Sequence, residues 1–265
     1  MILALINTKG GVGKTTSAVS LAAALAERGH STLLIDLDSQ CSASLSLGLS
    51  REDFNPSAAH VLFGQLPAID AVRSTDQEHL SIIPASIELA SIDLTLASKP
   101  GREEYLARAL APIRSEFEYI ILDCPPSLSL VPINALVAAD AYIVPITPQY
   151  LSLEGLATLL DAVDSLRESM DTGATMLGLL LTLCDHGANR SRTTKDVIGM
   201  IRTAYGKKVF DTEIPVTVRL GEAPSRGQTI FAYDNSSPGA SAYRQLATEV
   251  TTRAASLRRK QRKIT

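Results

Sequence analysis

The sequence predicts an α/β fold, a mostly parallel twisted sheet with helices on both faces. Strand-like apolar runs alternate with helical patterns along almost the whole chain, as βαβ units require. The apolar fraction of 45% with only 5% aromatics and no Trp suits a parallel sheet packed by aliphatic side chains. A glycine-rich turn joins the first strand to the first helix. Because no linker or repeat interrupts the 265 residues, we expect a single domain over residues 1–265.

The predicted elements follow in order along the chain. Apolar runs predict strands at 2–7, 32–36, 80–84, 119–123, 141–145, 176–182 and 208–211. Helical spacing of apolar residues predicts helices at 15–28, 103–113, 130–138, 153–169, 195–205 and 240–257. Residues 40–78 are punctuated by Ser, Pro and Gly, and they predict short helices over one sheet edge.

The turn after the first strand reads Lys-Gly-Gly-Val-Gly-Lys-Thr-Thr, which predicts a phosphate-binding loop. In such a loop, backbone N–H groups and a helix N-terminus surround the anion, a lysine reaches the outer phosphates and a hydroxyl meets Mg²⁺. Those roles fall to Lys14 and Thr15. The common pattern has glycine at the position of Thr8, and here a second lysine, Lys9, follows instead. The predicted nucleotide-binding residues are Lys9, Gly10, Gly11, Val12, Gly13, Lys14, Thr15 and Thr16.

Lys9 has two interpretations. A lysine at the loop entrance can simply extend into solvent. Alternatively, its ammonium reaches the phosphates of a second molecule across the nucleotide, where it stabilises the transferring phosphoryl group as an arginine finger does. The second interpretation makes ATP the link between two copies of the chain.

Acidic residues follow two of the predicted strands. Asp36 and Asp38 end the second strand, and the carboxyl end of a parallel strand faces the phosphate loop. Asp38 is expected to orient the attacking water and to join Thr15 and Asp123 at the metal. Asp36 either supports the metal shell or caps the following helix. Asp123 ends an apolar strand, the usual place of a Mg²⁺-holding aspartate in phosphate-loop proteins.

Charge is distributed unevenly. The net charge is −3, yet the last fifteen residues hold six basic residues and no acid, which leaves 19 basic against 28 acidic groups in the remainder. We expect a basic C-terminal helix or tail at about 253–265. It is either a solvated helix end or an electrostatic contact for polyanions.

Composition also restricts the cellular setting. No run of eighteen apolar residues is long enough to cross a bilayer. The first strand begins at residue 2, which leaves no room for a signal peptide. Cys41, Cys124 and Cys184 are scattered and lack metal spacing, so we expect reduced thiols in a cytoplasmic protein.

These segments together resemble the ParA family of partition ATPases, within the deviant phosphate-loop group that includes MinD. The resemblance covers almost the whole chain and is carried by residues 9–16, 35–40, 122–128, 214–225 and 233–234. The block at 214–225 is particular to ParA-type proteins. Because no helix-turn-helix pattern precedes the first strand, the chain looks like the short form that does not read an operator.

The resemblance implies a cycle of ATP binding and slow hydrolysis with Mg²⁺. ATP closes a sandwich homodimer in which Lys9 crosses to the partner's nucleotide and Gly10 allows close approach. The dimer binds double-stranded DNA without sequence preference, so the protein is nucleoid-associated, and a ParB-type centromere-binding partner stimulates its release. Pro215 and Thr217 would lie against the adenine base, and Arg219 would belong to the DNA-binding surface.

The chain departs from the family at two places. Relatives usually have asparagine at the position of Thr217, which puts a side-chain contact to adenine in question. Relatives often carry a DNA-contacting arginine at the position of Gly187, whereas Arg190 and Arg192 stand nearby here. These two arginines either substitute for it or solvate a helix start.

Three alternative functions follow from the same fold. A MinD-like membrane-cycling ATPase needs an amphipathic C-terminal helix with bulky apolar residues on one face, and the tail offers only Leu257 and Ile264 of that kind. An iron–sulfur reductase needs cysteines at a dimer axis, which the spacing does not indicate. A ParA-like ATPase that positions a protein cargo on the nucleoid stays open, because the cargo is chosen by the partner.

Overall fold

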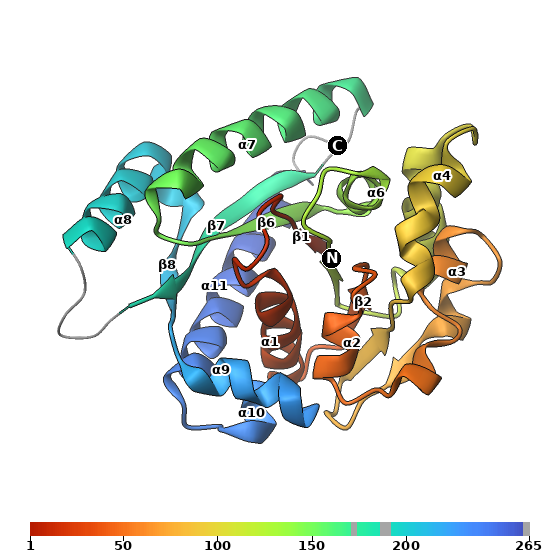
Figure 1. Cartoon of the computed structure of the whole chain (residues 1–265), viewed down its shortest axis with the longest axis horizontal. Helices are drawn as coiled ribbons and strands as arrows, with labels where there is room; N and C mark the ends of the chain where they lie inside the picture. Colours follow the sequence, from red (N-terminus) through yellow and green to blue (C-terminus); the bar gives the residue numbers. More distant parts are fainter. Residues whose placement is uncertain (171–173, 186–191, 262–265) are drawn as a thin grey trace.

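The computed structural model describes residues 1–170, 174–185 and 192–261 and contains one eight-stranded sheet (Figure 1). The strands are β1 (Ile2–Leu5), β2 (Thr32–Asp36), β3 (Arg73–Ser74), β4 (Leu80–Ile83), β5 (Tyr119–Asp123), β6 (Ala141–Ile146), β7 (Thr175–Cys184) and β8 (Val209–Pro215). Their order is β3-β4-β2-β5-β1-β6-β7-β8. Every neighbouring pair is parallel except β3–β4, which is antiparallel.

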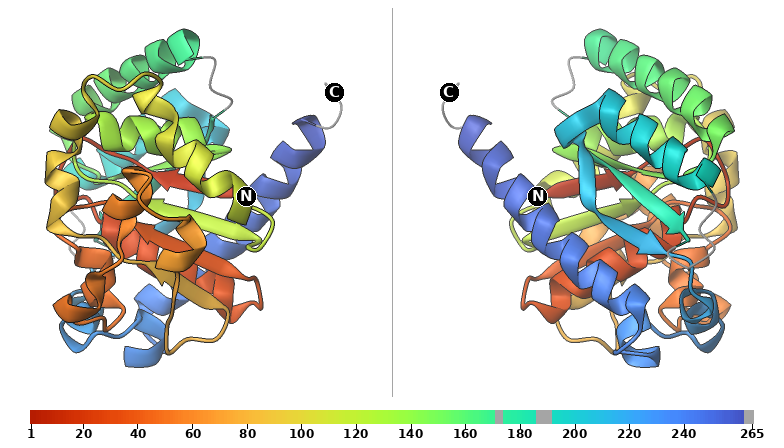
Figure 2. Two further views of the ribbon diagram at one scale, coloured as in Figure 1. Left: turned by 90° about the vertical axis from the view of Figure 1, so that its right-hand side faces the viewer. Right: turned by 90° about the vertical axis from the view of Figure 1, so that its left-hand side faces the viewer.

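The helices cover both faces of this sheet (Figures 1 and 2). They are α1 (Lys14–Glu27), α2 (Ser42–Ser46), α3 (Ala58–Leu62), α4 (Ile92–Leu96), α5 (Tyr105–Leu110), α6 (Leu130–Ala138), α7 (Tyr150–Met170), α8 (Arg192–Tyr205), α9 (Val218–Glu222), α10 (Ile230–Tyr233) and α11 (Pro238–Gln261). Short 3₁₀ turns lie at η1 (Arg51–Phe54), η2 (Ala68–Ala71), η3 (Ile87–Ser91), η4 (Arg102–Glu104), η5 (Ala111–Ile113), η6 (Gly206–Lys208) and η7 (Ala223–Arg226).

Two hydrophobic cores result from the alternation of side chains along the strands. Ile2 and Ala4 of β1 point into a core closed by α3, α5, α6, α7 and α8. Leu3 and Leu5 point the other way, into a core closed by α1, α10 and α11. Because β1 is buried on both faces, its sequence is uniformly apolar and not alternating. The α/β fold class predicted from the sequence is therefore confirmed.

The seven predicted strands are all present, and the last is longer than predicted. The expected strand at 208–211 is β8, which runs from Val209 to Pro215. The exposed Asp211 and the Glu213 that pairs with Arg202 of α8 interrupt the apolar run, so the sequence did not reveal the full length of this edge strand. The two-residue strand β3 is too short to leave a periodic signal in the sequence.

The helices differ from prediction mainly where they are short. The expected helix at 103–113 is divided into η4, α5 and η5, and Pro112 lies in the first turn of η5. The expected short helices within 40–78 are present as α2, η1, α3 and η2. The sequence did not reveal α4, α9 and α10, because four or five residues complete too few turns to show helical periodicity.

Helix α11 holds α1 along its length. Near the start of α1, the buried hydroxyls of Ser17 and Tyr243 lie 3.1 Å apart. At its other end, Glu27 accepts two hydrogen bonds from the Arg244 guanidinium at 2.6 and 2.7 Å, and Arg28 donates to the Thr248 hydroxyl at 2.9 Å. Since α1 follows directly from the phosphate loop, these contacts fix the loop relative to the sheet.

We predict that Tyr243→Phe lowers the free energy of unfolding by about 1–2 kcal/mol, because the Ser17 hydroxyl loses its buried partner. Urea denaturation measures the change. The double variant Ser17→Ala/Tyr243→Phe should lose little more than the single one, since both partners are then removed. A loss equal to the sum of the two single variants would contradict a direct hydrogen bond between them.

Candidate nucleotide-binding site

The phosphate loop and the acidic segments meet at one edge of the sheet. β1 pairs with β5 and β5 with β2, and Asp123 is the register partner of both Leu5 and Asp36. The carboxyl ends of the three strands therefore open side by side, with the loop leading from β1 into α1 (Figure 1). The structure brings the two sequence-predicted acidic segments to the loop, although they lie far apart along the chain.

The backbone of the loop depends on glycine at two positions. Gly11 and Gly13 have φ of 71° and 76°, in the left-handed region that other residues rarely adopt. Behind the loop, the Thr182 hydroxyl of β7 donates to the carbonyl oxygen of Val12 at 2.8 Å. Gly10 is different, because its φ is outside the left-handed region and a Cβ there would meet none of the described atoms within 4 Å. Packing inside this chain therefore does not require glycine at position 10.

Lys14 is the buried cation of the loop. Its side chain is only 7% exposed, and its Nζ donates to the carbonyl oxygen of Lys9 at 3.0 Å. Burial lowers the pKa of Lys14, while the carboxylates of Asp123 and Asp38 act to raise it. Bound phosphate would act in the same direction as these carboxylates. The lysine is thus placed between acidic side chains and the anion cradle at the start of α1.

Lys9 lies on the exposed rim of the loop. Its Nζ donates to the Gln149 amide oxygen at 3.4 Å and to the Ser152 hydroxyl at 3.3 Å. Both contacts are long and go to neutral oxygens, so an incoming phosphate oxygen would replace them with a stronger, charge-assisted bond. Gln149 and Ser152 are residues that the sequence analysis missed, because nothing in their local sequence indicates contact with a loop about 140 residues away.

Asp123 is fully buried, and no donor among the described residues meets either carboxylate oxygen with hydrogen-bond geometry. Desolvation raises the pKa of Asp123 well above its ordinary value, and Asp36 adds to the rise. The nearby Thr15 hydroxyl and the Lys14 ammonium oppose it. A buried carboxylate without a hydrogen-bond donor, beside a hydroxyl and an anion cradle, fits Mg²⁺ held partly by phosphate oxygens and water.

The described residues contain no cluster of three or more His, Cys, Asp or Glu side chains that could hold a metal alone. Mg²⁺ usually binds through one or two carboxylates plus phosphate oxygens and water, so this donor set suits it. The three cysteines are buried and form no disulfide. Burial raises the pKa of the Cys41 thiol to about 11.

Asp36 caps the helix that follows it. Its Oδ2 accepts hydrogen bonds from the Ser44 amide at 2.8 Å and the Ser44 hydroxyl at 2.7 Å, and its Oδ1 accepts one from the Asp38 amide at 3.2 Å. Burial raises its pKa to about 6 in spite of these bonds. Of the two interpretations open at the level of sequence, the structure favours the helix cap over the metal shell.

Asp38 is half-buried and more accessible than Asp36. Its Oδ1 accepts a hydrogen bond from the Gln40 amide at 3.0 Å, and among the described residues no donor bonds to its Oδ2. Asp38 acts electrostatically on both Lys14 and Asp123, so it belongs to the same charged cluster. A carboxylate with one oxygen fixed by the backbone and the other available can accept a hydrogen bond from water.

The segment that the family resemblance assigns to adenine follows β8. Pro215 ends the strand in register with Cys184, and the Thr217 hydroxyl accepts a hydrogen bond from the Arg219 amide at 3.3 Å as the N-cap of α9. The next elements close on α1, where Leu220 and Pro224 line a small hollow together with Thr16. The Thr217 hydroxyl is therefore used in part by its own backbone.

Arg219 is exposed but already paired. Its guanidinium contacts Glu222 at 3.0 Å and Asp234 at 3.3 Å, and the Tyr233 hydroxyl donates to the same Glu222 carboxylate. Hydrogen bonds to Glu222 raise the pKa of Arg219 and lower that of Glu222. The sequence did not reveal this cluster, because Asp234 joins it through the packing of α10 against α9.

The other two candidate DNA contacts lie at the limit of the described chain. Arg190 falls outside the described residues, as does Gly187. Arg192 is the first residue of α8, and its side chain is outside the described part. Within the described ranges, no helix combines the length and apolarity that crossing a bilayer demands.

Comparison with known proteins finds a family model and curated relatives that cover most of the chain. A family model described as "AAA domain" matches residues 1–176. The sporulation initiation inhibitor protein Soj of Bacillus subtilis is 41% identical over 94% of this chain and 97% of its own length. The chromosome partitioning protein ParA of Caulobacter vibrioides is 39% identical over 95% of this chain and 94% of its own length.

A solved structure shares the fold over nearly the full chain. It is cobyrinic acid a,c-diamide synthase from Mycobacterium smegmatis with bound ATP analogue and magnesium, with a TM-score of 0.80 and 35% identity. The match covers 93% of this chain and 92% of that one. The phosphate loop with its second lysine, the buried aspartate and the likeness to Soj and ParA over almost the whole sequence lead to one assignment: the chain belongs to the Soj/ParA family of partitioning ATPases.

Proposed function

We propose that this ATPase partitions DNA: its ATP-bound dimer holds DNA without sequence preference, and hydrolysis stimulated by a ParB-type centromere-binding protein releases it. The relatives named for chromosome partitioning support this role. The observation that carries it is Lys9, an exposed second lysine at the mouth of the phosphate loop. On this proposal the protein acts in the cytoplasm, on the nucleoid.

Lys9 has the properties that a cation supplied in trans needs. It lies at the rim, its contacts to neutral oxygens are long, and it is followed by Gly10, whose missing side chain no neighbour within the chain requires. The absence of a side chain at the exposed Gly10 is explained if the backbone or nucleotide of a second copy approaches closely there. In the proposed dimer, Lys9 of each copy stabilises charge on the phosphates of the other.

Hydrolysis follows from the roles of the remaining residues. The loop amides and Lys14 bind the phosphates, and Thr15 with Asp123 would hold Mg²⁺, which when bound neutralises charge developing on the phosphate oxygens. Asp38 would orient the attacking water through its available Oδ2 and take part in the outer metal shell. Adenine would lie against Pro215 and the Thr217 backbone, since the threonine hydroxyl caps α9.

DNA binding would rest on phosphate contacts from arginine and lysine, which are sequence-independent and weaken with salt. Arg219 is the first candidate, and Arg190 and Arg192 are further ones. The basic end of α11 is a third region: Arg258 packs 5.8 Å from the Tyr119 ring centroid, while Arg259 and Lys260 are exposed.

A membrane-cycling function is disfavoured by the same end of α11. Leu257, one of the two apolar residues of the tail, packs against the core formed with α1. The described end of the helix therefore presents cations and no apolar face that could enter a lipid surface. Positioning of a protein cargo would use the same cycle with another partner, and no observation on this chain favours it over DNA.

The proposal predicts DNA retention only with intact triphosphate. In a bead or filter assay, the chain should hold random-sequence DNA with ATP or a non-hydrolysable analogue, but not with ADP or without nucleotide. Affinity should fall steeply as salt rises. Lys14→Ala is the nucleotide-blind control. Equal retention in all nucleotide states would contradict the proposal.

Asp38→Ala should bind ATP, form the dimer and retain DNA, yet release phosphate at least about tenfold more slowly, because the water loses its orienting carboxylate. A phosphate-release assay and sedimentation velocity measure the two properties on one sample. Asp36→Asn is the matched comparison and should mainly lower stability through its cap on Ser44. Undiminished hydrolysis by Asp38→Ala would remove this residue from the reaction.

Arg219→Ala and Glu222→Gln should shift DNA affinity in opposite directions. The first removes a phosphate-binding cation and should weaken retention about three- to tenfold, with the salt slope reduced by about one. The second leaves Arg219 with one carboxylate fewer and should strengthen retention. ATP-dependent dimerisation, followed by sedimentation, should be unchanged in both. A shift in the same direction for both variants would exclude Arg219 from the DNA surface.

A further inference from the structure

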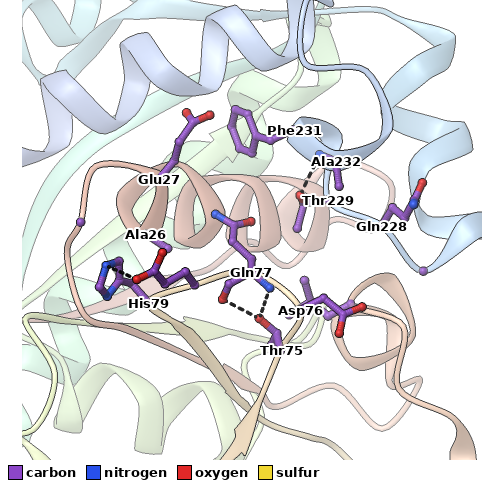
Figure 3. A pocket seen from close by; sticks show the side chains of 14 residues that line it. Ala26, Glu27, Thr75, Asp76, Gln77, His79, Gln228, Thr229, Phe231 and Ala232 are labelled. Carbon is purple, nitrogen blue, oxygen red and sulfur yellow. Dashed lines mark hydrogen bonds and ion pairs between the residues drawn. The ribbon is translucent and has the colours of Figure 1, made fainter.

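A hollow of about 610 Å³ lies at the end of α1 that is remote from the phosphate loop. Three segments and Leu47, which follows α2, line it: the segments are the end of α1, the turn between β3 and β4, and the stretch from Gly227 to Ala232 that contains the start of α10. In Figure 3, Gln77 and Asp76 lie on the β3–β4 turn, across the hollow from Phe231 and Ala232. Its size is that of a ligand site, and it shares no residue with the nucleotide site.

The lining of this hollow is acidic. Glu27, Asp76 and Glu78 carry carboxylates, and none of the described residues that line it is lysine or arginine. Asp76 has no hydrogen-bond or ion-pair partner for its side chain among the described residues, while Glu78 is paired only with His79 at 3.4 Å. The C-terminal end of α1 adds the negative pole of the helix dipole. All three features favour a cation.

One wall of the hollow already binds a guanidinium. Arg244 of α11 donates two hydrogen bonds to Glu27 at 2.6 and 2.7 Å, and its guanidinium carbon lies 4.9 Å from the centre of the Phe231 ring. This internal contact shows that a carboxylate beside an aromatic face at this place suits arginine. The carboxylate of Asp76, by contrast, is not paired with any lysine, arginine or histidine that the structure describes.

The apolar part of the lining favours a cationic side chain over a small inorganic cation. Ala26, Leu47 and Phe231 are buried apolar residues that contribute to the lining. The Gln77 amide nitrogen donates to the Ala23 carbonyl at 2.6 Å, which fixes the side chain and leaves its amide oxygen as an acceptor. A guanidinium with several donors, carried on an aliphatic stem, would use both the acceptors and the apolar floor.

We propose that this hollow binds an arginine side chain of a partner polypeptide, with the aliphatic stem on the Leu47 and Phe231 side and the guanidinium toward Asp76 and the Gln77 amide oxygen. The hollow shares no lining residue with the phosphate loop or with the cluster of Arg219, Glu222 and Asp234. It therefore gives the chain a second place at which a protein partner can attach, at the far end of the helix that begins at the phosphate loop.

The test measures binding of a short fluorescent peptide of alternating Arg, Leu and Ala by anisotropy at low ionic strength. The same peptide with citrulline in place of Arg is the neutral control. The double variant Asp76→Asn/Glu78→Gln should bind the Arg peptide about tenfold more weakly than the wild-type chain. The matched double variant Asp161→Asn/Glu168→Gln, on the exposed face of α7, should bind it like wild type.

A second variant tests the cavity without changing charge. Ala232 is exposed at the rim, so Ala232→Trp should fold normally, as judged by its thermal unfolding, and should block the peptide. Four results would overturn the proposal: equal weakening in the α7 control, equal binding of the citrulline peptide, spermidine binding as tight as the Arg peptide, or a wild-type Kd above about 1 mM. The proposal would also be overturned if the Asp76→Asn/Glu78→Gln variant sedimented differently from the wild-type chain without peptide. The hollow would then be a contact between two copies of this chain.

Discussion

The site depends on two carboxyl groups that are buried side by side at the carboxyl ends of neighbouring strands. Asp36 and Asp123 are register partners, and both are completely buried. Asp36 accepts three hydrogen bonds from its own loop, whereas no described residue donates a hydrogen bond of ordinary geometry to Asp123. Among the described residues, Lys14 and Thr15 are the groups that favour the charged form of Asp123. A divalent cation brought in with the nucleotide would remove the cost of burying this carboxylate, so ligand binding and local stability are coupled.

Helix α1 connects this charge cluster to the rest of the molecule. Its fourteen residues span about 21 Å, from the anion cradle at Lys14 to the acidic hollow beyond Glu27. The dipole of one helix thus favours an anion at one end and a cation at the other. α11 fixes both ends, through Tyr243 near the loop and Arg244 at the hollow. A partner that altered the Arg244–Glu27 contact would change the packing of α11 on α1, which also holds the phosphate loop in place.

The sequence was most informative where function depends on neighbours along the chain. The loop needs a strand, three glycines, a lysine and a threonine in one short stretch, so the position of Lys14 and Thr15 at the start of α1 was predictable, and the position of Asp123 at the end of β5 followed from the strand before it. Roles that depend on residues far away in the sequence were not predictable. The cap of Asp36 on Ser44 requires the turn into α2, and the contacts of Lys9 and the pairing of Arg219 with Asp234 require the complete fold. Short elements such as α9 were not predicted, because five residues are too few to show helical periodicity.

The pairing of Arg219 bears on why DNA binding would need a dimer. One guanidinium shared between Glu222 and Asp234 gives a local net charge of −1, on a chain whose net charge is already negative. A phosphate must compete with two carboxylates, so a single copy offers a weak contact. When two copies are joined through ATP, the second set of contacts forms at high effective concentration, and the weak affinities multiply. In the proposed cycle, ATP would then switch DNA binding on by doubling the number of Arg219 contacts in one complex. The basic residues themselves would not need to change.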